Sequence, residues 1–235
     1  MTGRSFDIKA RVEQLNEEIV KAAAKANRNP ADIDLMAVTK TVDPAIINAA
    51  IDAGVKMLGE NRVQEFISKA DAYQLSNGCE VHFIGHLQTN KVRQIIGRVS
   101  MIQSVDRIEL AREIDRCAKN NGMVMPVLIE VNIGREEKKF GVLPERLMEL
   151  VESVALFSNL QLNGLMAIPP FDVTDKVLES YFDTMYRHFI DIRSKKMDNV
   201  VMKKLSLGMT QDFRLAIKHN SNIIRIGRGL FGERM

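Results

Sequence analysis

Short apolar runs alternate with helical patterns along nearly the whole 235-residue chain. A strand and a helix that alternate without interruption favour parallel strands, because parallel neighbours need a long return connection. There are eight apolar runs, which is the number of strands that closes a (β/α)8 barrel. We therefore predict an α/β TIM barrel. An open, doubly wound sheet is the competing architecture, since periodicity does not reveal whether the last strand meets the first. The predicted strands cover residues 35–39, 57–59, 81–84, 101–105, 127–133, 162–168, 205–207 and 223–226.

An additional helix is expected before the first strand. Ile8, Val12, Leu15, Ile19 and Ala23 recur at steps of three or four residues, which places them on one face of an amphipathic helix. We expect residues 1–30 to carry this helix against the barrel, and residues 1–235 to form a single domain, because barrels of this size occur undivided.

Start and stop signals flank several of the predicted helices. Asp43 and Pro44 form an N-cap followed by proline, Asp106 with Glu109 matches a capping box, and Thr210 is expected to cap a helix that begins at residue 211. Glycines at positions 54, 97 and 122 are expected to end helices.

Composition and charge exclude several classes of function. With 33 basic and 30 acidic residues, the net charge of +3 is too small to indicate a nucleic-acid surface. We find no apolar stretch of membrane-spanning length and no secretory signal pattern, so we expect a cytoplasmic protein that binds no membrane. Cys79 and Cys117 form no C-x-x-C pattern, and we predict neither a disulfide nor a metal site.

Lys40 directly follows the first predicted strand. Functional groups of parallel barrels stand at the carboxyl ends of the strands, so the Lys40 amine is expected at the barrel mouth. A lysine attacks an aldehyde only when it is neutral, and apolar surroundings or nearby cations favour that form. The position suits Schiff-base chemistry, whereas the alternative is a solvated lysine at the start of a loop.

The loops after the seventh and eighth strands have the composition of an anion site. The first reads Ser206-Leu207-Gly208-Met209-Thr210, and the second is Gly-Arg-Gly at 227–229. In this fold these two loops frequently bind phosphate through backbone N–H groups. The alternative is that the glycines serve only to form turns.

Arg225 lies inside the eighth predicted strand. A buried guanidinium requires a specific partner, because desolvation of an unpaired charge is costly. A pyridine nitrogen, a phosphate or a carboxylate of a ligand would serve, and the alternative is a salt bridge to a barrel acid such as Glu130.

Polar residues also follow the second and third strands. In the segment 59–65, Asn61 is expected either to contact a ligand ring or to cap the next helix. His86 has the position to face the mouth, as a general base or as a hydrogen-bonded residue of the rim. The loop 134–141 is interpreted as a solvated rim in which Lys139 is a second amine near the mouth.

Several sequence blocks together resemble the pyridoxal-phosphate homeostasis family, which is related in fold to the barrel domain of alanine racemase. They cover most of the chain from about residue 10. The blocks are A-V-T-K at 37–40, G-E-N-R-V-Q-E at 59–65, H-F-I-G-H-L-Q-T-N-K at 82–91, G-L-M-A-I at 164–168, S-L-G-M-T-Q-D-F at 206–213 and R-I-G-R-G-L-F-G at 225–232.

This resemblance implies pyridoxal 5'-phosphate as the cofactor, held as a Schiff base on Lys40. An arginine at the pyridine nitrogen disfavours ring protonation and thereby weakens the ring as an electron sink, which suits holding more than turnover. The further implied contacts are Asn61 beside the ring, Arg225 at the pyridine nitrogen, Ser206 and Gly227 at the phosphate, Met209 nearby, and Arg228 and His86 as secondary contacts.

Three positions depart from the family pattern. Arg228 stands where relatives usually have a small hydroxyl residue, Arg62 replaces an aromatic or small residue, and Phe140 replaces a small one. Since arginine has no hydroxyl group, the hydroxyl contact to phosphate usual in the family is not expected at position 228.

The expected function is that of a carrier in vitamin B6 homeostasis that releases pyridoxal phosphate to other proteins, including apoenzymes that require it, without substantial catalysis. We expect a monomer, since the resemblance covers the barrel and not the additional racemase domain. The alternative is an amino-acid racemase or a lysine Schiff-base aldolase, motivated by Lys40 at the catalytic face of a barrel.

Overall fold

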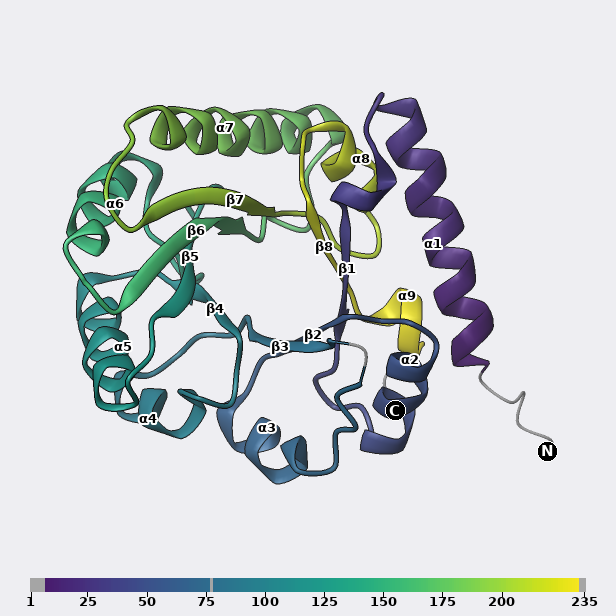
Figure 1. Cartoon of the computed structure of the whole chain (residues 1–235). Coiled ribbons are helices and arrows are strands. Elements are labelled where there is room, and N and C mark those ends of the chain that lie inside the picture. The colour runs from purple at the N-terminus through teal and green to yellow at the C-terminus, as the bar shows by residue number, and fades with distance from the viewer. Residues whose placement is uncertain (1–6, 77, 233–235) are drawn as a thin grey trace.

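The strands close into a barrel (Figure 1). In this computed structural model, which describes residues 7–76 and 78–232, eight parallel strands follow one another in chain order, and β1 pairs with both β2 and β8. Met36 of β1 lies opposite Arg225 of β8, so the predicted TIM barrel is confirmed and the open sheet is excluded. The strands are β1 (Asp34–Val38), β2 (Met57–Glu60), β3 (Glu80–Phe83), β4 (Met101–Val105), β5 (Met125–Val131), β6 (Leu160–Ala167), β7 (Val200–Ser206) and β8 (Ile223–Ile226).

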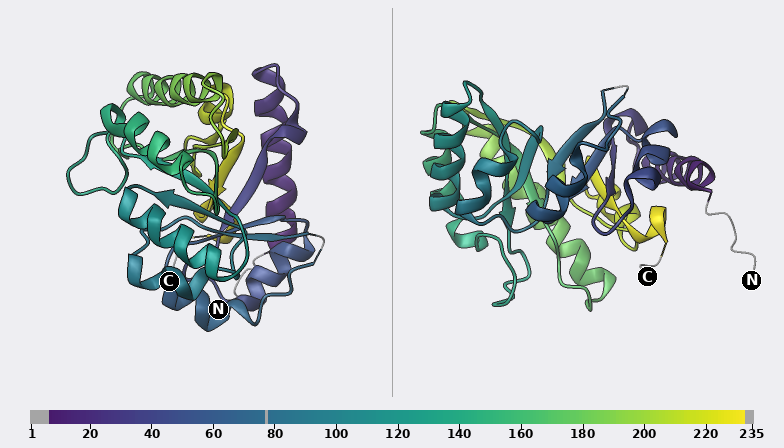
Figure 2. Two further views of the ribbon diagram at one scale, coloured as in Figure 1. Left: turned by 60° about the vertical axis from the view of Figure 1, so that its left-hand side comes forward. Right: turned by 90° about the horizontal axis from the view of Figure 1, so that it is seen from below.

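Helices surround the barrel and cover its outer face (Figure 1). In the right-hand view of Figure 2, the teal loop between β5 and α6 and the green helix α7 extend from one end of the barrel. The helices are α1 (Ile8–Lys25), α2 (Pro44–Asp52), α3 (Val63–Ala70), α4 (Val92–Ile95), α5 (Ile108–Asn120), α6 (Leu147–Ala155), α7 (Asp175–Ser194), α8 (Phe213–Lys218) and α9 (Arg228–Phe231), with short 3-10 turns at Pro30–Asp32, Thr89–Lys91 and Pro144–Arg146.

The additional N-terminal helix is confirmed, and its apolar face packs on the barrel helices. Val12 and Ala23 of α1 are fully buried, and α1 contacts α2, α8 and α9. Beyond the helix, the Arg28 guanidinium donates to the carbonyls of Ile217 (2.9 Å) and Ser221 (2.5 Å). This side chain connects the N-terminal segment to the end of α8 and to the loop after it.

Hydrophobic packing separates into an outer layer and a smaller barrel interior. The outer layer, between strands and helices, holds most of the buried apolar side chains. Inside the barrel, Met36 and Met57 pack with Ile84 and Ile223, while Met101 packs with Leu128 and Met166. Methionine is flexible and fills irregular space, so the interior is less rigidly specified than one made of branched residues.

Strand positions agree with the sequence prediction to within two residues except at β7, which begins five residues earlier than predicted. Lys203 and Lys204 interrupt the apolar pattern there and concealed the strand. Lys204 instead forms an ion pair with Asp34 at the start of β1 (2.6 Å). The charged pair is therefore part of the strand-starting end of the barrel.

Two of the three predicted helix caps are wrong. Asp43 caps α2 by accepting from the Ala45 N–H (2.8 Å), as predicted. In contrast, α5 begins after Arg107 without a side-chain cap, because the Asp106 carboxylate is bound to the Arg107 guanidinium. Thr210 does not cap α8, which begins only at Phe213.

The glycines predicted to end helices, at positions 54, 97 and 122, all adopt positive φ, as predicted. None of the helices within residues 7–76 and 78–232 combines the length and apolar character needed to cross a bilayer.

Candidate functional site

A cavity of about 470 Å³ lies at the carboxyl ends of the strands. It collects residues at the ends of β1, β2, β3, β6, β7 and β8 or in the loops after them, which are far apart in the sequence. Its lining is made of Val38, Lys40, Asn61, Ile84, Ile168, Pro169, Pro170, Phe171, Val173, Asp175, Leu178, Met209, Thr210, Gln211, Asp212, Arg225, Gly227 and Arg228. Parallel barrels place their ligand sites at this end.

Lys40 lines this cavity, as the sequence predicted for a residue at the end of the first strand. It shares the cavity with apolar side chains such as Val38 and Ile84 and with the cations Arg225 and Arg228. The carboxylates of Asp175 and Asp212 line the same cavity, so charges of both signs meet there. Lys40 itself is half-buried and lies in the turn after β1.

Arg225 is 3% exposed and satisfies its hydrogen bonds with oxygens of neighbouring strands. Its guanidinium donates to the Ser206 carbonyl (2.7 Å), the Ser206 hydroxyl (2.7 Å) and the Ala167 carbonyl (2.8 Å). Burial lowers the pKa of Arg225 to about 10, against the opposing effect of Asp212 and Glu130, so the side chain stays charged at neutral pH. Ser206 is fully buried and binds Arg225, and it does not belong to the cavity lining.

The salt bridge to Glu130, which was the alternative for Arg225, is not among the ion pairs of the described residues. Glu130 nevertheless is 8% exposed, and burial, helped by the charge of Asp106, raises the pKa of Glu130 to about 7, while Arg225 acts in the opposite direction. A carboxyl that titrates near neutrality therefore lies in the barrel interior.

The loops after β7 and β8 are joined by hydrogen bonds. The Arg225 N–H donates to the Gly208 carbonyl (3.0 Å), and the Gly229 N–H donates to the Thr210 hydroxyl (3.2 Å). Met209, Gly227 and the neighbouring Arg228 line the cavity. The two loops predicted as an anion site are thus adjacent, although Thr210 joins them instead of capping a helix.

The segment 59–65 divides between two sides of the barrel wall. Asn61 lines the cavity, and the helix after it begins behind Arg62 without a side-chain cap, so Asn61 is not the cap considered as an alternative. Glu60 and Glu65 instead bind Lys69 on α3. Only part of this polar segment can contact a ligand, because successive strand residues point to opposite faces.

His86 lies on the rim outside the cavity lining. Its ring stacks on Phe140, with centroids 3.6 Å apart, and its Nδ1 lies 3.9 Å from the Asp106 carboxylate. Burial lowers the pKa of His86, Arg107 lowers it further, and Asp106 opposes this shift. The acidic neighbour was not evident from the sequence, because Asp106 follows a different strand.

The loop 134–141 is held against other loops. Lys139 forms an ion pair with Glu136 and donates to the Pro169 carbonyl (3.3 Å). Phe140 stacks on His86 as described above. The interpretation of a purely solvated rim is therefore incomplete, and Lys139 is attached to the loop that follows β6.

Sequence reasoning missed the loop after β6. Ile168, Pro169, Pro170, Phe171 and Val173 all line the cavity. The site was predicted from charged and glycine-rich segments, and this stretch is apolar. The adjacent prolines directly after a predicted strand were the available signal, since they end the strand and begin a loop at the barrel mouth.

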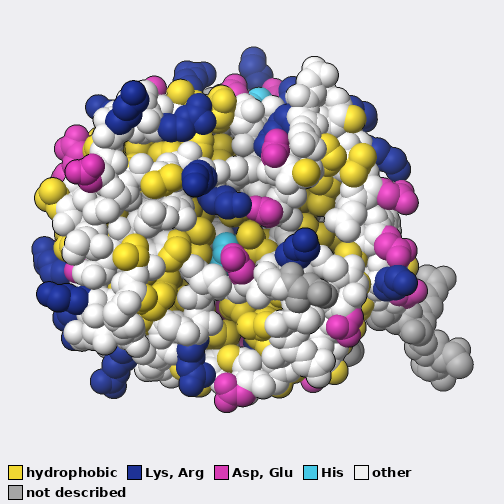
Figure 3. Space-filling model, viewed as in Figure 1, with side chains coloured by type: hydrophobic (Ala, Val, Ile, Leu, Met, Phe, Trp, Pro, Cys, Tyr) yellow, Lys and Arg dark blue, Asp and Glu magenta, His cyan; other side chains and the backbone are white. Residues whose placement is uncertain are grey.

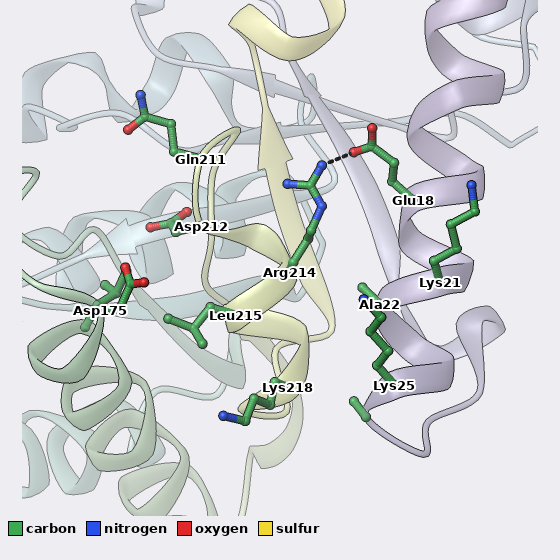
Figure 4. Close-up of a pocket in the computed structure, with 12 residues that line it drawn as sticks. Glu18, Lys21, Ala22, Lys25, Asp175, Gln211, Asp212, Arg214, Leu215 and Lys218 are labelled. Carbon is green, nitrogen blue, oxygen red and sulfur yellow. Dashed lines mark hydrogen bonds and ion pairs between the residues drawn. The ribbon is translucent and has the colours of Figure 1, made fainter.

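A second hollow, of about 540 Å³, lies between α1, α7 and α8 (Figure 4). Across it Arg214 points to Glu18 and forms an ion pair, and Lys218 pairs with Glu179 (2.8 Å). Asp175, Leu178, Gln211 and Asp212 line both hollows, so the start of α7 and the loop after β7 lie between the two.

On the face shown in Figure 3, acidic and basic side chains are interspersed and form no continuous basic stripe.

Residues 11–235 match the family described as alanine racemase, N-terminal domain. The chain is 43% identical over 224 residues to the pyridoxal phosphate homeostasis protein of Aquifex aeolicus, covering 95% of this chain and 97% of the relative. The solved structure of PipY from Synechococcus elongatus with PLP bound has a TM-score of 0.83 at 28% identity, covering 96% of this chain and all of that one.

The fold is also similar to alanine racemase of Clostridium difficile, with a TM-score of 0.71 at 16% identity over 93% of this chain and 56% of that chain. At this identity the likeness concerns the fold alone. The full-length similarity to the Aquifex protein and the family match over residues 11–235 establish the family of this chain. The chain therefore belongs to the pyridoxal phosphate homeostasis protein family, which is built on the alanine racemase N-terminal domain.

Proposed function

We propose that this protein binds pyridoxal 5'-phosphate as a Schiff base on Lys40 and serves vitamin B6 homeostasis by holding and releasing it. The observation that carries the proposal is the convergence of Lys40, Asn61, Arg225 and the two glycine-containing loops on one cavity. The relative from Aquifex aeolicus is named for this role, and PipY was solved with PLP bound.

The residues present fit such a group. A cavity of about 470 Å³ is in the range of small-molecule sites, and its lining combines apolar walls with a few polar groups. Gly227 and Arg228 would hold the phosphate, together with the loop after β7, which contains Met209. Backbone N–H groups of these loops and the Arg228 guanidinium both favour an anion. Ser206 would act indirectly, through its bonds to Arg225.

Lys40 supplies the covalent link in this proposal. Its neutral amine adds to an aldehyde carbon, and loss of one water molecule leaves a carbon–nitrogen double bond. When bound, pyridoxal phosphate supplies that aldehyde and a ring that can accept electrons. The reverse reaction with water releases the cofactor, so the same lysine serves both holding and release.

Arg225 supports holding over turnover. Its guanidinium remains charged and is fixed by hydrogen bonds to Ser206 and Ala167. A positive charge near a pyridine nitrogen disfavours protonation of that nitrogen, and an unprotonated ring stabilises a carbanion poorly. We therefore propose that any catalysis on amino acids is weak.

The second candidate function is that of a racemase or lysine Schiff-base aldolase. The observation that favours it is the presence of acid–base groups in the barrel, namely Glu130 with a pKa near 7 and the His86–Asp106 pair. Chiral analysis of amino acids incubated with the purified protein distinguishes the two functions, since inversion or cleavage at enzyme-like rates would displace the carrier proposal.

Lys40→Ala is expected to abolish the visible absorption of the Schiff base while the barrel remains folded, because the residue lies beyond the strand and outside the packed layers. The measurement is absorption after addition of pyridoxal phosphate, followed by borohydride reduction and peptide mass mapping.

Lys139→Ala is the matched control, since it removes another amine near the mouth and leaves Lys40 intact. Retention of the absorption by the Lys40 variant, or reduction onto a peptide without Lys40, would refute the assignment.

The proposal also includes a cytoplasmic, monomeric carrier that delivers its cofactor to apoenzymes. Sedimentation velocity tests the monomer. Transfer is tested by mixing the loaded protein with an apoenzyme that requires pyridoxal phosphate and comparing reactivation with that given by the same concentration of free cofactor.

A further inference from the structure

A buried polar network lies behind the cavity, on the helix-facing side of β1 and β2. Glu60 is fully buried and accepts hydrogen bonds from the Thr39 hydroxyl (2.5 Å) and the Tyr73 hydroxyl (2.5 Å). The Lys69 ammonium lies 3.3 Å from the same Glu60 oxygen. Lys69 comes from α3, so the network joins that helix to both strands.

Lys69 is 7% exposed, which is rare for a lysine. Its ammonium donates to the Thr39 carbonyl (2.7 Å) and to Glu65 (2.8 Å). Burial by itself would raise the pKa of Glu65, but the hydrogen bonds from Lys69 and from the Thr41 backbone hold it below its ordinary value. Both partners of this ion pair therefore have specific contacts beyond each other.

Those contacts fall on the two peptide groups that flank Lys40. Lys69 binds the carbonyl of Thr39, which belongs to the peptide group before Lys40. Glu65 accepts from the N–H of Thr41, which belongs to the peptide group after Lys40. The ion pair thus fixes the backbone on both sides of this one residue.

The backbone that it fixes is strained. Thr41 has a φ of 61°, in the left-handed region that a β-branched residue rarely adopts. A residue held there is strained and persists only where surrounding contacts enforce it. Glu65 supplies such a contact, because the N–H that it binds is that of Thr41 itself.

We propose that the Lys69–Glu65 ion pair is a positioning device for the Schiff-base lysine: it holds the Thr39–Lys40–Thr41 backbone so that the Lys40 amine is directed into the cavity. This inference rests on the proposed function of Lys40. Packing alone does not require the pair, because a buried ion pair is often no more stabilising than apolar residues of similar volume.

Lys69→Met is expected to weaken pyridoxal phosphate binding by about 10- to 100-fold, since misplacing a reacting group by about 1 Å has effects of this size. Glu65→Gln keeps a side-chain acceptor for Thr41 but removes the charge, so an intermediate loss is expected. The double variant is expected to be no worse than Lys69→Met, because the two residues act as one unit. Lys69→Arg, which keeps the charge, is expected to recover part of the binding.

The matched control is Lys204→Met, which breaks the ion pair to Asp34 at the opposite end of β1. It makes the same chemical change on a lysine tied to the same strand. This variant is expected to keep the wild-type dissociation constant to within about twofold, since the pair is partly exposed and lies at the end of the strand away from Lys40. A loss of binding equal to that of Lys69→Met would identify a general effect on folding and overturn the proposal.

A second measurement follows the Lys40 amine without the cofactor. The rate at which an amine-reactive reagent acylates Lys40 is measured at one pH by peptide mass mapping. In Lys69→Met and in Glu65→Gln this rate is expected to differ from the wild-type rate, because the backbone no longer holds the amine in one position. An unchanged rate in both variants would contradict a positioning role. Glu65→Gln alone provides the test if Lys69→Met does not fold.

The two proposals fail in different ways. If the wild-type protein forms no Schiff base, the proposed function is wrong, whatever the variants do. If the wild-type protein forms it and both ion-pair variants form it with wild-type affinity, only the positioning role is wrong.

Discussion

Glu130 and Arg225 show how single side chains set the electrostatics of the barrel interior. Both are almost fully buried, and each shifts the pKa of the other toward the charged form. Arg225 stays charged because carbonyl and hydroxyl oxygens surround it. Burial, helped by the charge of Asp106, raises the pKa of Glu130 to about 7, so its charge changes near neutral pH.

This raised pKa predicts a pH dependence of stability. The folded protein binds the Glu130 proton more tightly than the unfolded chain, in which the pKa is near 4.5. The stabilisation is complete below about pH 4.5 and is lost as pH rises through about 7. Glu130→Gln cannot ionise, so relative to the wild type it should gain on the order of 1–3 kcal/mol between pH 5 and pH 8.

Urea unfolding of both proteins at several pH values measures this difference. Glu152→Gln, an exposed position on α6, is the control and should follow the wild type. If the gap between wild type and Glu130→Gln stayed constant with pH, Glu130 would not be the titrating group.

At the scale of elements, loops carry the site and helices support it. The loop after β7 contacts the start of α9 through Thr210, and the loop after β5 contacts the loop after β6 through Lys139. The helix α3 reaches behind β1 through Lys69. The geometry of the mouth therefore depends on contacts between consecutive βα units.

Gly208 allows the close packing of the loop after β7 on α8. Its φ is +89°, and a Cβ there would lie 2.6 Å from the Ala216 Cβ and 2.9 Å from the Phe213 Cα. Gly208→Ala is expected to cost at least about 2 kcal/mol of unfolding free energy, from backbone strain together with overpacking, and to weaken cofactor binding.

Gly122→Ala separates these two causes. Gly122 has a φ of +63°, but a Cβ there would meet no described atom within 4 Å. This variant should lose only about 1 kcal/mol, from the backbone conformation alone, with unchanged binding. Urea unfolding and cofactor titration of both variants check the prediction, and equal losses would show that packing on α8 is unimportant.

At the scale of the whole molecule, the cofactor is expected to stabilise the barrel. A ligand that binds only the folded state contributes about 2.7 kcal/mol at a concentration 100 times its dissociation constant. For a domain of this size, that raises Tm by roughly 5–10 °C. The site joins loops from most of the ring, so its occupation should stabilise the barrel as one unit.

Differential scanning calorimetry with and without pyridoxal phosphate measures this shift. Pyridoxal, which lacks the phosphate, should give a smaller shift at the same concentration, and Lys40→Ala should show a reduced one. Equal shifts for pyridoxal and pyridoxal phosphate would argue against phosphate binding by the loops after β7 and β8.

The sequence by itself determined the strands, the N-terminal helix and the placement of Lys40, Asn61 and the two glycine-containing loops at strand ends. These features depend on local periodicity and on the position of a residue within its own βα unit. Residues close together in the sequence determine both. The β7 boundary was missed because Lys204 has its partner, Asp34, 170 residues away.

Only the tertiary structure decided the closure of the barrel, the oxygens around Arg225, the apolar wall from 168–173 and the approach of Asp106 to His86. It also brought Lys69 and Glu65 onto the peptide groups that flank Lys40. Each of these contacts joins residues from different βα units, and the pattern within one unit carries no information about which side chain of another unit meets it. The physical reason is that closing the ring, and not any local propensity, sets those distances.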